Sequence, residues 1–67
     1  MKRGRVHWYS KNLGHGLIVP EDGGSQAFVR REDLAAGEEE NLKNNDEVFF
    51  EAIEGTERPG ARNILRA

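Results

Sequence analysis

Five short apolar clusters, separated by residues that favour turns, constrain the fold of this 67-residue chain more than any other feature of its sequence. The clusters occupy residues 5–10, 16–19, 27–30, 47–53 and 61–67. Pro20 ends the second cluster, because proline has no N–H to donate to a central sheet ladder. Gly23 and Gly24 follow in the stretch EDGG, which predicts a hairpin turn. Clusters of this length and spacing predict five β-strands and an all-β chain.

Closure into a barrel is the expected arrangement of these strands. An open sheet of five short strands exposes its edges, whereas a barrel removes the edges and buries one alternating face. Residues 32–36 predict one helical turn after the third strand. Alternation assigns the barrel interior to Ile18, Ala27, Val29, Val48, Phe50, Ala52 and Ile64, with Val6 and Leu34 as plugs.

The opposite face of the second and third strands carries His15, Leu17, Phe28 and Arg30. An exposed phenylalanine beside a leucine lowers solubility unless a partner covers it, so this face predicts a binding surface.

On the fourth strand Phe49 points outward. That ring is a candidate contact for a partner or a second copy, although single exposed aromatic residues are common.

Composition excludes several classes of protein. The chain has no cysteine and two histidines, so we expect no disulfide, no structural zinc, and neither a metal nor a cofactor. No apolar run reaches the roughly 18 residues of a membrane span, and the N-terminus lacks a signal-peptide core. The hydroxyls of Ser10, Ser25 and Thr56 show no arrangement with a base and an orienting group, so we expect no catalysis. The expectation is a single cytoplasmic domain over residues 1–67, without membrane association.

Charge is distributed unevenly along the chain. Residues 1–31 carry six lysine and arginine side chains against two carboxylates, a net charge of +4. Residues 32–67 carry four against ten, a net charge of −6. Such an asymmetry indicates an anion-binding half, although a highly charged surface also serves simply to keep a small domain soluble.

Several segments occur in a characteristic order: GRVHWYS, LGHGLIVP, AFVR, LKNNDEVFFE and EGTERPGARNI. Their order and spacing resemble the cold-shock domain family, whose members are five-stranded antiparallel OB-fold barrels that bind single-stranded RNA and DNA. The first two segments match the family pattern Gly-x-Val-Lys-Trp-Phe-Asn followed by Lys-Gly-Phe-Gly-Phe-Ile-x-Pro, and AFVR matches Val-Phe-Val-His. The resemblance covers essentially the whole chain. It implies a nucleic-acid-binding protein of the cold-shock, RNA-chaperone or transcription-regulating type.

In that family, aromatic residues of the first three strands form a platform on which successive bases stack. The resemblance assigns this role, by position, to Trp8, Tyr9, His15, Leu17 and Phe28. His15 and Leu17 stand where the family has phenylalanine, and leucine has no π-face. Imidazole groups stack with less area and titrate near about pH 6.5, so a protonated His15 would also attract phosphate. The alternative is that His15 is a solvated strand residue.

The other binding positions that the resemblance implies are basic or titratable: His7, Lys11, Arg30, Arg31 and Arg58. A guanidinium can stack on a base and pair with phosphate, so the Arg30–Arg31 pair is expected to offset part of the lost stacking. Losing two full stacks, at about 1–3 kcal/mol each, predicts binding about 2–5 kcal/mol weaker than in typical family members.

The loop after the third strand departs most from the family, because Glu38, Glu39 and Glu40 stand where the family often has an aromatic residue. Carboxylates beside a binding groove repel phosphate. Three interpretations of these glutamates stay open. They form a solvated loop without a role, an autoinhibitory or specificity element, or a contact for a basic partner.

The expected partner is single-stranded RNA or DNA, bound with modest sequence preference by a monomer or weak homodimer. The alternative function is a protein-interaction or dimerisation module that keeps the cold-shock fold and has lost most nucleic-acid binding.

Overall fold

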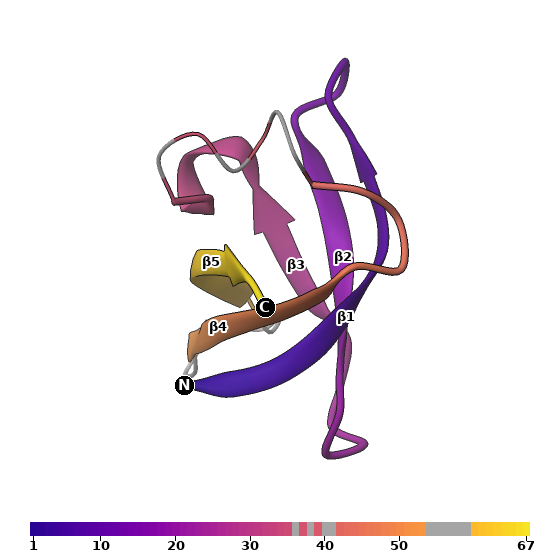
Figure 1. Cartoon of the computed structure of the whole chain (residues 1–67), viewed down its shortest axis with the longest axis vertical. Helices are drawn as coiled ribbons and strands as arrows, with labels where there is room; N and C mark the ends of the chain where they lie inside the picture. The colour runs from indigo at the N-terminus through magenta and orange to yellow at the C-terminus, as the bar shows by residue number, and fades with distance from the viewer. Residues whose placement is uncertain (36, 38, 40–41, 54–59) are drawn as a thin grey trace.

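In the part of the chain that the structure describes, five β-strands and one 3-10 helix follow one another (Figure 1). They are β1 (Lys2–Ser10), β2 (His15–Pro20), β3 (Ala27–Arg30), η1 (Arg31–Asp33), β4 (Glu47–Ile53) and β5 (Gly60–Arg66). This computed structural model describes residues 1–35, 37, 39, 42–53 and 60–67. The five predicted strands are confirmed, and the predicted helical turn is the shorter η1. Within the described ranges, no helix has the length and apolar character needed to cross a membrane.

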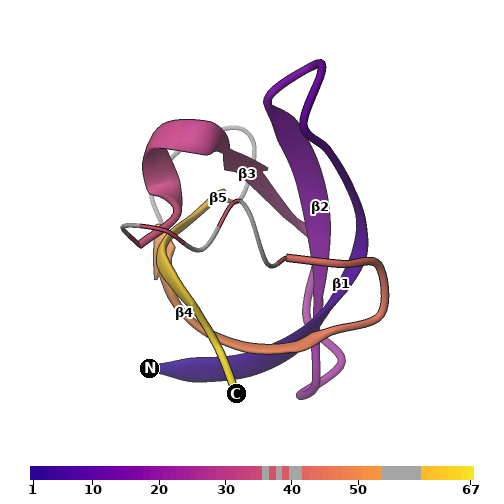
Figure 2. The same ribbon diagram turned by 45° about the horizontal axis from the view of Figure 1, so that its top comes forward.

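The strands close into a barrel in the order β1-β2-β3-β5-β4 (Figure 2). β1 lies between β2 and β4 and is antiparallel to both. β3 and β5 pair in parallel through Phe28 and Gly60, which corrects the expectation of a wholly antiparallel barrel. The reason is geometric: strand directions cannot alternate all the way around a closed ring with an odd number of strands.

The barrel interior is filled largely by the side chains that alternation assigns to it. The buried residues among them are Val6, Ile18, Ala27, Val29, Val48, Phe50 and Ile64, and Leu34 packs against this core as a half-buried neighbour. Ala52 is exposed, so its predicted place in the core was wrong. It lies near the end of β4, where alternation gives the direction of a side chain but not whether anything covers it.

Two further residues, Leu42 and Ala61, are buried although no interior position was predicted for them. Asn63 has a φ of 54°, and the register between β4 and β5 shifts beside it. The extra residue in β5 reverses the alternation and turns Ala61 into the core. Leu42 enters the core from the segment before β4, outside any strand.

A tight connection joins β1 to β2 and fixes the ends of both strands. The Gly14 N–H donates a hydrogen bond of 2.7 Å to the Ser10 carbonyl. The Leu13 N–H donates one of 3.1 Å to the Ser10 hydroxyl oxygen. Gly14 has a φ of 73°, a left-handed conformation that glycine adopts without a steric clash. This connection holds His15 at the first position of β2.

Candidate nucleic-acid interface

A β-bulge in β1 turns Trp8 to the outer face of the barrel. Val6, which is buried, pairs with Ile18. The next pair in the ladder joins Trp8 to Leu17, which leaves His7 as an extra residue in β1. Uninterrupted alternation from Val6 would point Trp8 inward, because side chains two residues apart share a face. The extra residue reverses that direction, and Trp8 is half-buried on the outside.

Three aromatic rings lie side by side on this outer face, one each from β1, β2 and β3. The ring centroids of Trp8 and His15 are 5.5 Å apart, with an angle of 73° between the ring planes. Those of His15 and Phe28 are also 5.5 Å apart, at 30°. Leu17 pairs with Trp8 in one ladder and with Phe28 in the other. We call these four half-buried side chains, Trp8, His15, Leu17 and Phe28, the ring surface.

The ring surface combines apolar area with a neighbouring cation. The Arg30 guanidinium carbon lies 5.8 Å from the ring centroid of Phe28, and Arg30 itself is exposed at the end of β3. Aromatic faces stack on flat rings of any kind, and a guanidinium pairs with planar or tetrahedral anions. This arrangement suits a ligand that has both flat aromatic groups and negative charges.

Gly16 brings β1 and β2 close together beside this surface. It pairs with Tyr9, and a Cβ atom on Gly16 would lie 2.8 Å from the Tyr9 Cα and closer still to the Trp8 carbonyl oxygen. Any side chain here would push β1 away from β2. The glycine therefore maintains the ladder that positions Trp8 against His15.

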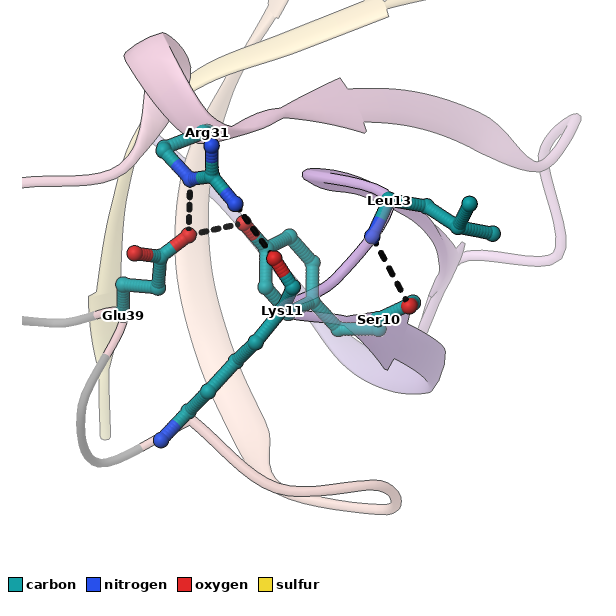
Figure 3. A network of polar contacts seen from close by, with 6 residues as sticks. Ser10, Lys11, Leu13, Arg31 and Glu39 are labelled. Atoms are coloured by element: carbon teal, nitrogen blue, oxygen red, sulfur yellow. Dashed lines mark hydrogen bonds and ion pairs between the residues drawn. The ribbon is translucent and has the colours of Figure 1, made fainter.

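Tyr9 packs against the core and does not join the ring surface, because it follows Trp8 in β1 and faces the other way. Its hydroxyl donates a hydrogen bond of 2.7 Å to Glu39 Oε2. The same oxygen accepts a hydrogen bond from Arg31 Nε, and Arg31 Nη2 donates to the Lys11 carbonyl (Figure 3). We call Tyr9, Lys11, Arg31 and Glu39 the Arg31 cluster.

Contacts within the Arg31 cluster shift the pKa values of its members. Burial, followed by the hydrogen bond to Glu39 and the charge of that carboxylate, raises the pKa of Tyr9 to about 12. Hydrogen bonds from Arg31 and then Tyr9 hold the pKa of Glu39 below its ordinary value. The hydrogen bond to Glu39 and its charge raise the pKa of Arg31. At neutral pH the cluster therefore contains a carboxylate, a guanidinium cation and a neutral phenol.

A comparison with protein families identifies the fold and its ligand class. The family described as 'Cold-shock' DNA-binding domain matches residues 2–67. The chain belongs to the cold-shock domain family. This family binds nucleic acid and is not enzymatic, so the chain is a nucleic-acid-binding domain of the cold-shock type and not an enzyme.

Relatives of this cold-shock domain match it over almost its full length. A cold shock-like protein of Aquifex aeolicus is 36% identical over 62 residues, which cover 92% of this chain and 89% of the relative. Cold shock protein CspB of Geobacillus stearothermophilus is 35% identical over 66 residues, 98% of each chain. Cold shock-like protein CspE of Escherichia coli is 32% identical over 63 residues, 94% of this chain and 91% of the relative.

The two histidines of this cold-shock domain lie in different surroundings. His15 is the central ring of the ring surface. His7 is exposed and lines a pocket of about 330 Å³ whose described lining contains no residue of the ring surface. That pocket is formed by Gly4, Arg5, Val6, His7, Val19, Pro20, Glu21, Asn45 and Glu47. The extra residue in β1 therefore places His7 in different surroundings from the ring surface.

The predicted basic positions also divide into different surroundings. Arg30 is exposed beside the ring surface at the end of β3, whereas Lys11 is exposed in the β1–β2 connection and belongs to the Arg31 cluster. Arg31 is engaged by Glu39 within the Arg31 cluster. Arg58 lies outside the described residues, as do Glu38 and Glu40 of the acidic loop.

Phe49, considered above as a partner contact, is not a bare ring. It is half-buried on β4, and the Arg3 guanidinium carbon lies 5.1 Å from its ring centroid. The partner contact at Phe49 stays a prediction.

Sequence reasoning missed two features that shape the site. Nothing in the residues around His7 marks the bulge, because an inserted strand residue has no characteristic type. Arg31 and Glu39 are eight residues apart and lie in different elements, so no single strand or helix period predicts their contact. Without the bulge, alternation from the buried Val6 would point Tyr9 outward. The inward direction of Tyr9 can therefore be predicted only when the bulge at His7 is known.

Proposed function

We propose that this cold-shock domain binds single-stranded RNA or DNA by stacking unpaired bases on the ring surface. The observation that carries the proposal is the row of three rings on one outer face, with 5.5 Å between neighbouring centroids. Each stacked base contributes about 1–3 kcal/mol to binding, and every base has a π-face. Stacking on a protein ring requires a base that is free of its complementary strand. The ligand is therefore single-stranded, and its sequence matters only modestly.

Phosphate contacts come from the cations around the ring surface. The Arg30 guanidinium lies beside Phe28, so a strand with a base on Phe28 passes a phosphate within its reach. Lys11 is exposed on the connection before His15. Each phosphate contact to a single strand contributes about 0.7 to the slope of log affinity against log salt concentration. Binding is therefore weaker at high salt.

The affinity lies below that of typical cold-shock domains. Leu17 provides apolar contact without a π-face, and the imidazole of His15 has less area than a phenyl ring. The deficit is about 2–5 kcal/mol before the cations offset part of it. Such weak, sequence-tolerant binding fits an RNA chaperone or transcription regulator that acts in the cytoplasm as a monomer or weak homodimer. The chain has no cysteine, which fits a reducing compartment.

The emission of Trp8, the only tryptophan of the chain, tests this proposal directly. A titration with a short oligothymidine should quench the emission, and a higher salt concentration should shift the midpoint to more oligonucleotide. A blunt duplex of the same length is the control and should quench far less. If the protein is instead an interaction module, neither ligand changes the emission and calorimetry detects no heat of binding.

A further inference from the structure

The Glu39 carboxylate sits on the Arg31 guanidinium in the way a phosphate would. Its Oε2 atom accepts hydrogen bonds from Arg31 Nε and from the Tyr9 hydroxyl (Figure 3). Carboxylate and phosphate oxygens make the same charge-assisted hydrogen bonds with the N–H groups of arginine. A group that binds one of these anions can therefore exchange it for the other.

Arg31 lies next to the ring surface. Its backbone N–H donates a hydrogen bond of 2.9 Å to the carbonyl of Gly14, the residue that directly precedes His15. The guanidinium packs over the same glycine, because a Cβ atom on Gly14 would lie 3.2 Å from the Arg31 Cζ. Nη2 is held by the Lys11 carbonyl, which fixes the guanidinium beside the β1–β2 connection. A strand that continues past His15 would run over this position.

We infer that Arg31 is a phosphate-binding position for the bound strand, and that Glu39 occupies this position in the free protein. Strand binding then exchanges the Glu39 carboxylate for a backbone phosphate. The inference rests on the proposed function, because it requires a strand on the ring surface. It gives the acidic loop a defined role, in which one carboxylate competes with the ligand for one arginine.

The surroundings of the ion pair make this exchange feasible. The Arg31 side chain is 53% exposed and that of Glu39 is 28% exposed. Exposed ion pairs stabilise a fold only weakly, since water solvates both partners after separation. The Tyr9 hydroxyl, in contrast, retains the carboxylate close to Arg31 in the absence of ligand. The contact is therefore formed in the free protein and still displaceable by an anion.

Replacing Glu39 by glutamine tests the exchange, because it removes the charge and keeps the shape of the side chain. We expect Glu39→Gln to bind oligothymidine about two- to fivefold more tightly at low salt. The slope of log affinity against log salt concentration should change by less than about 0.7, the value of one phosphate contact, because wild type and variant form the same contact with Arg31 in the complex. The matched control is Glu51→Gln, which removes the same charge from an exposed glutamate that contacts Arg62 and Asn63 on the β4–β5 side. This control should change neither quantity.

The decisive comparison repeats the Glu39 substitution in an Arg31→Ala background. If Glu39 acts through Arg31, Glu39→Gln gains no affinity there. An equal gain in both backgrounds overturns the inference and attributes the effect to general repulsion, while binding itself and the proposed function stand. A wild-type protein that does not bind oligothymidine overturns the proposed function instead.

Tyr9→Phe provides a second variant in case Glu39→Gln does not fold. It removes the hydroxyl that holds Glu39 but retains the packed ring and both charges. As with Glu39→Gln, the affinity for oligothymidine should increase, but by less than about threefold. The increase should again require Arg31. Unchanged or weaker oligothymidine binding by both variants contradicts the inference.

Discussion

Replacing Phe28 by alanine removes the ring that joins β3 to the ring surface. Phe28 stacks on His15 with 5.5 Å between ring centroids, and its centroid lies 5.8 Å from the Arg30 guanidinium carbon. Truncation therefore removes one stacking face and the cation–π contact of Arg30. One lost base stack corresponds to about 1–3 kcal/mol, which weakens oligothymidine binding about 5- to 150-fold. Since Phe28 is half-buried, the free energy of unfolding should fall by less than the about 3–5 kcal/mol typical of a buried phenylalanine.

Phe49→Ala is a matched control for this measurement. Phe49 is also half-buried and also lies near a guanidinium, that of Arg3 at 5.1 Å, but it belongs to β4. Both variants should be titrated through Trp8 emission at about 15 °C, near the usual temperature of maximum stability, after circular dichroism has shown that they are folded. The reasoning is refuted if Phe28→Ala binds oligothymidine as wild type does, or if Phe49→Ala weakens binding equally.

Three further measurements address the titratable groups and the close strand contact. His15→Gln should weaken oligothymidine binding in the Trp8 titration, because it removes the central ring of the ring surface. Tyr9, the only tyrosine, should ionise near pH 12 in ultraviolet absorbance and at lower pH in Glu39→Gln. Because the folded-state pKa of Tyr9 lies above its ordinary 10.0, its contribution to stability is full below pH 10 and should be lost as the pH rises towards about 12. Gly16→Ala should lower the free energy of unfolding by at least about 1–3 kcal/mol, because the added methyl group overpacks β1 and β2. Gly60→Ala, where a Cβ atom would have its nearest neighbour at 3.5 Å, should lower it much less in thermal melts. An equal loss of stability in both variants would contradict the close contact between Gly16 and β1.

Much of the fold could be predicted because its signals are local. The strands at 27–30 and 47–53 match their predicted bounds, since alternation and flanking turn residues mark both ends. Val6, Ile18 and Val48 are buried as expected, because each lies at a position that the strand pattern assigns to the barrel interior. Ala52 was predicted to be buried and is exposed, whereas Ala61 is buried without having been predicted. Both differences depend on how β4 and β5 pair near Asn63 and the end of β4, which the sequence of a single strand does not specify.

The site divides in the same way. The amino-acid sequence by itself determined the five strands, the family and the presence of aromatic and basic side chains on one face of β2 and β3. Only the tertiary structure decided that Tyr9 faces the core and not the ring surface, and that Arg31 is paired with Glu39. The physical reason is that one inserted residue at His7 reverses every later side chain of β1, and closure of the barrel brings together groups whose separation along the chain follows no period.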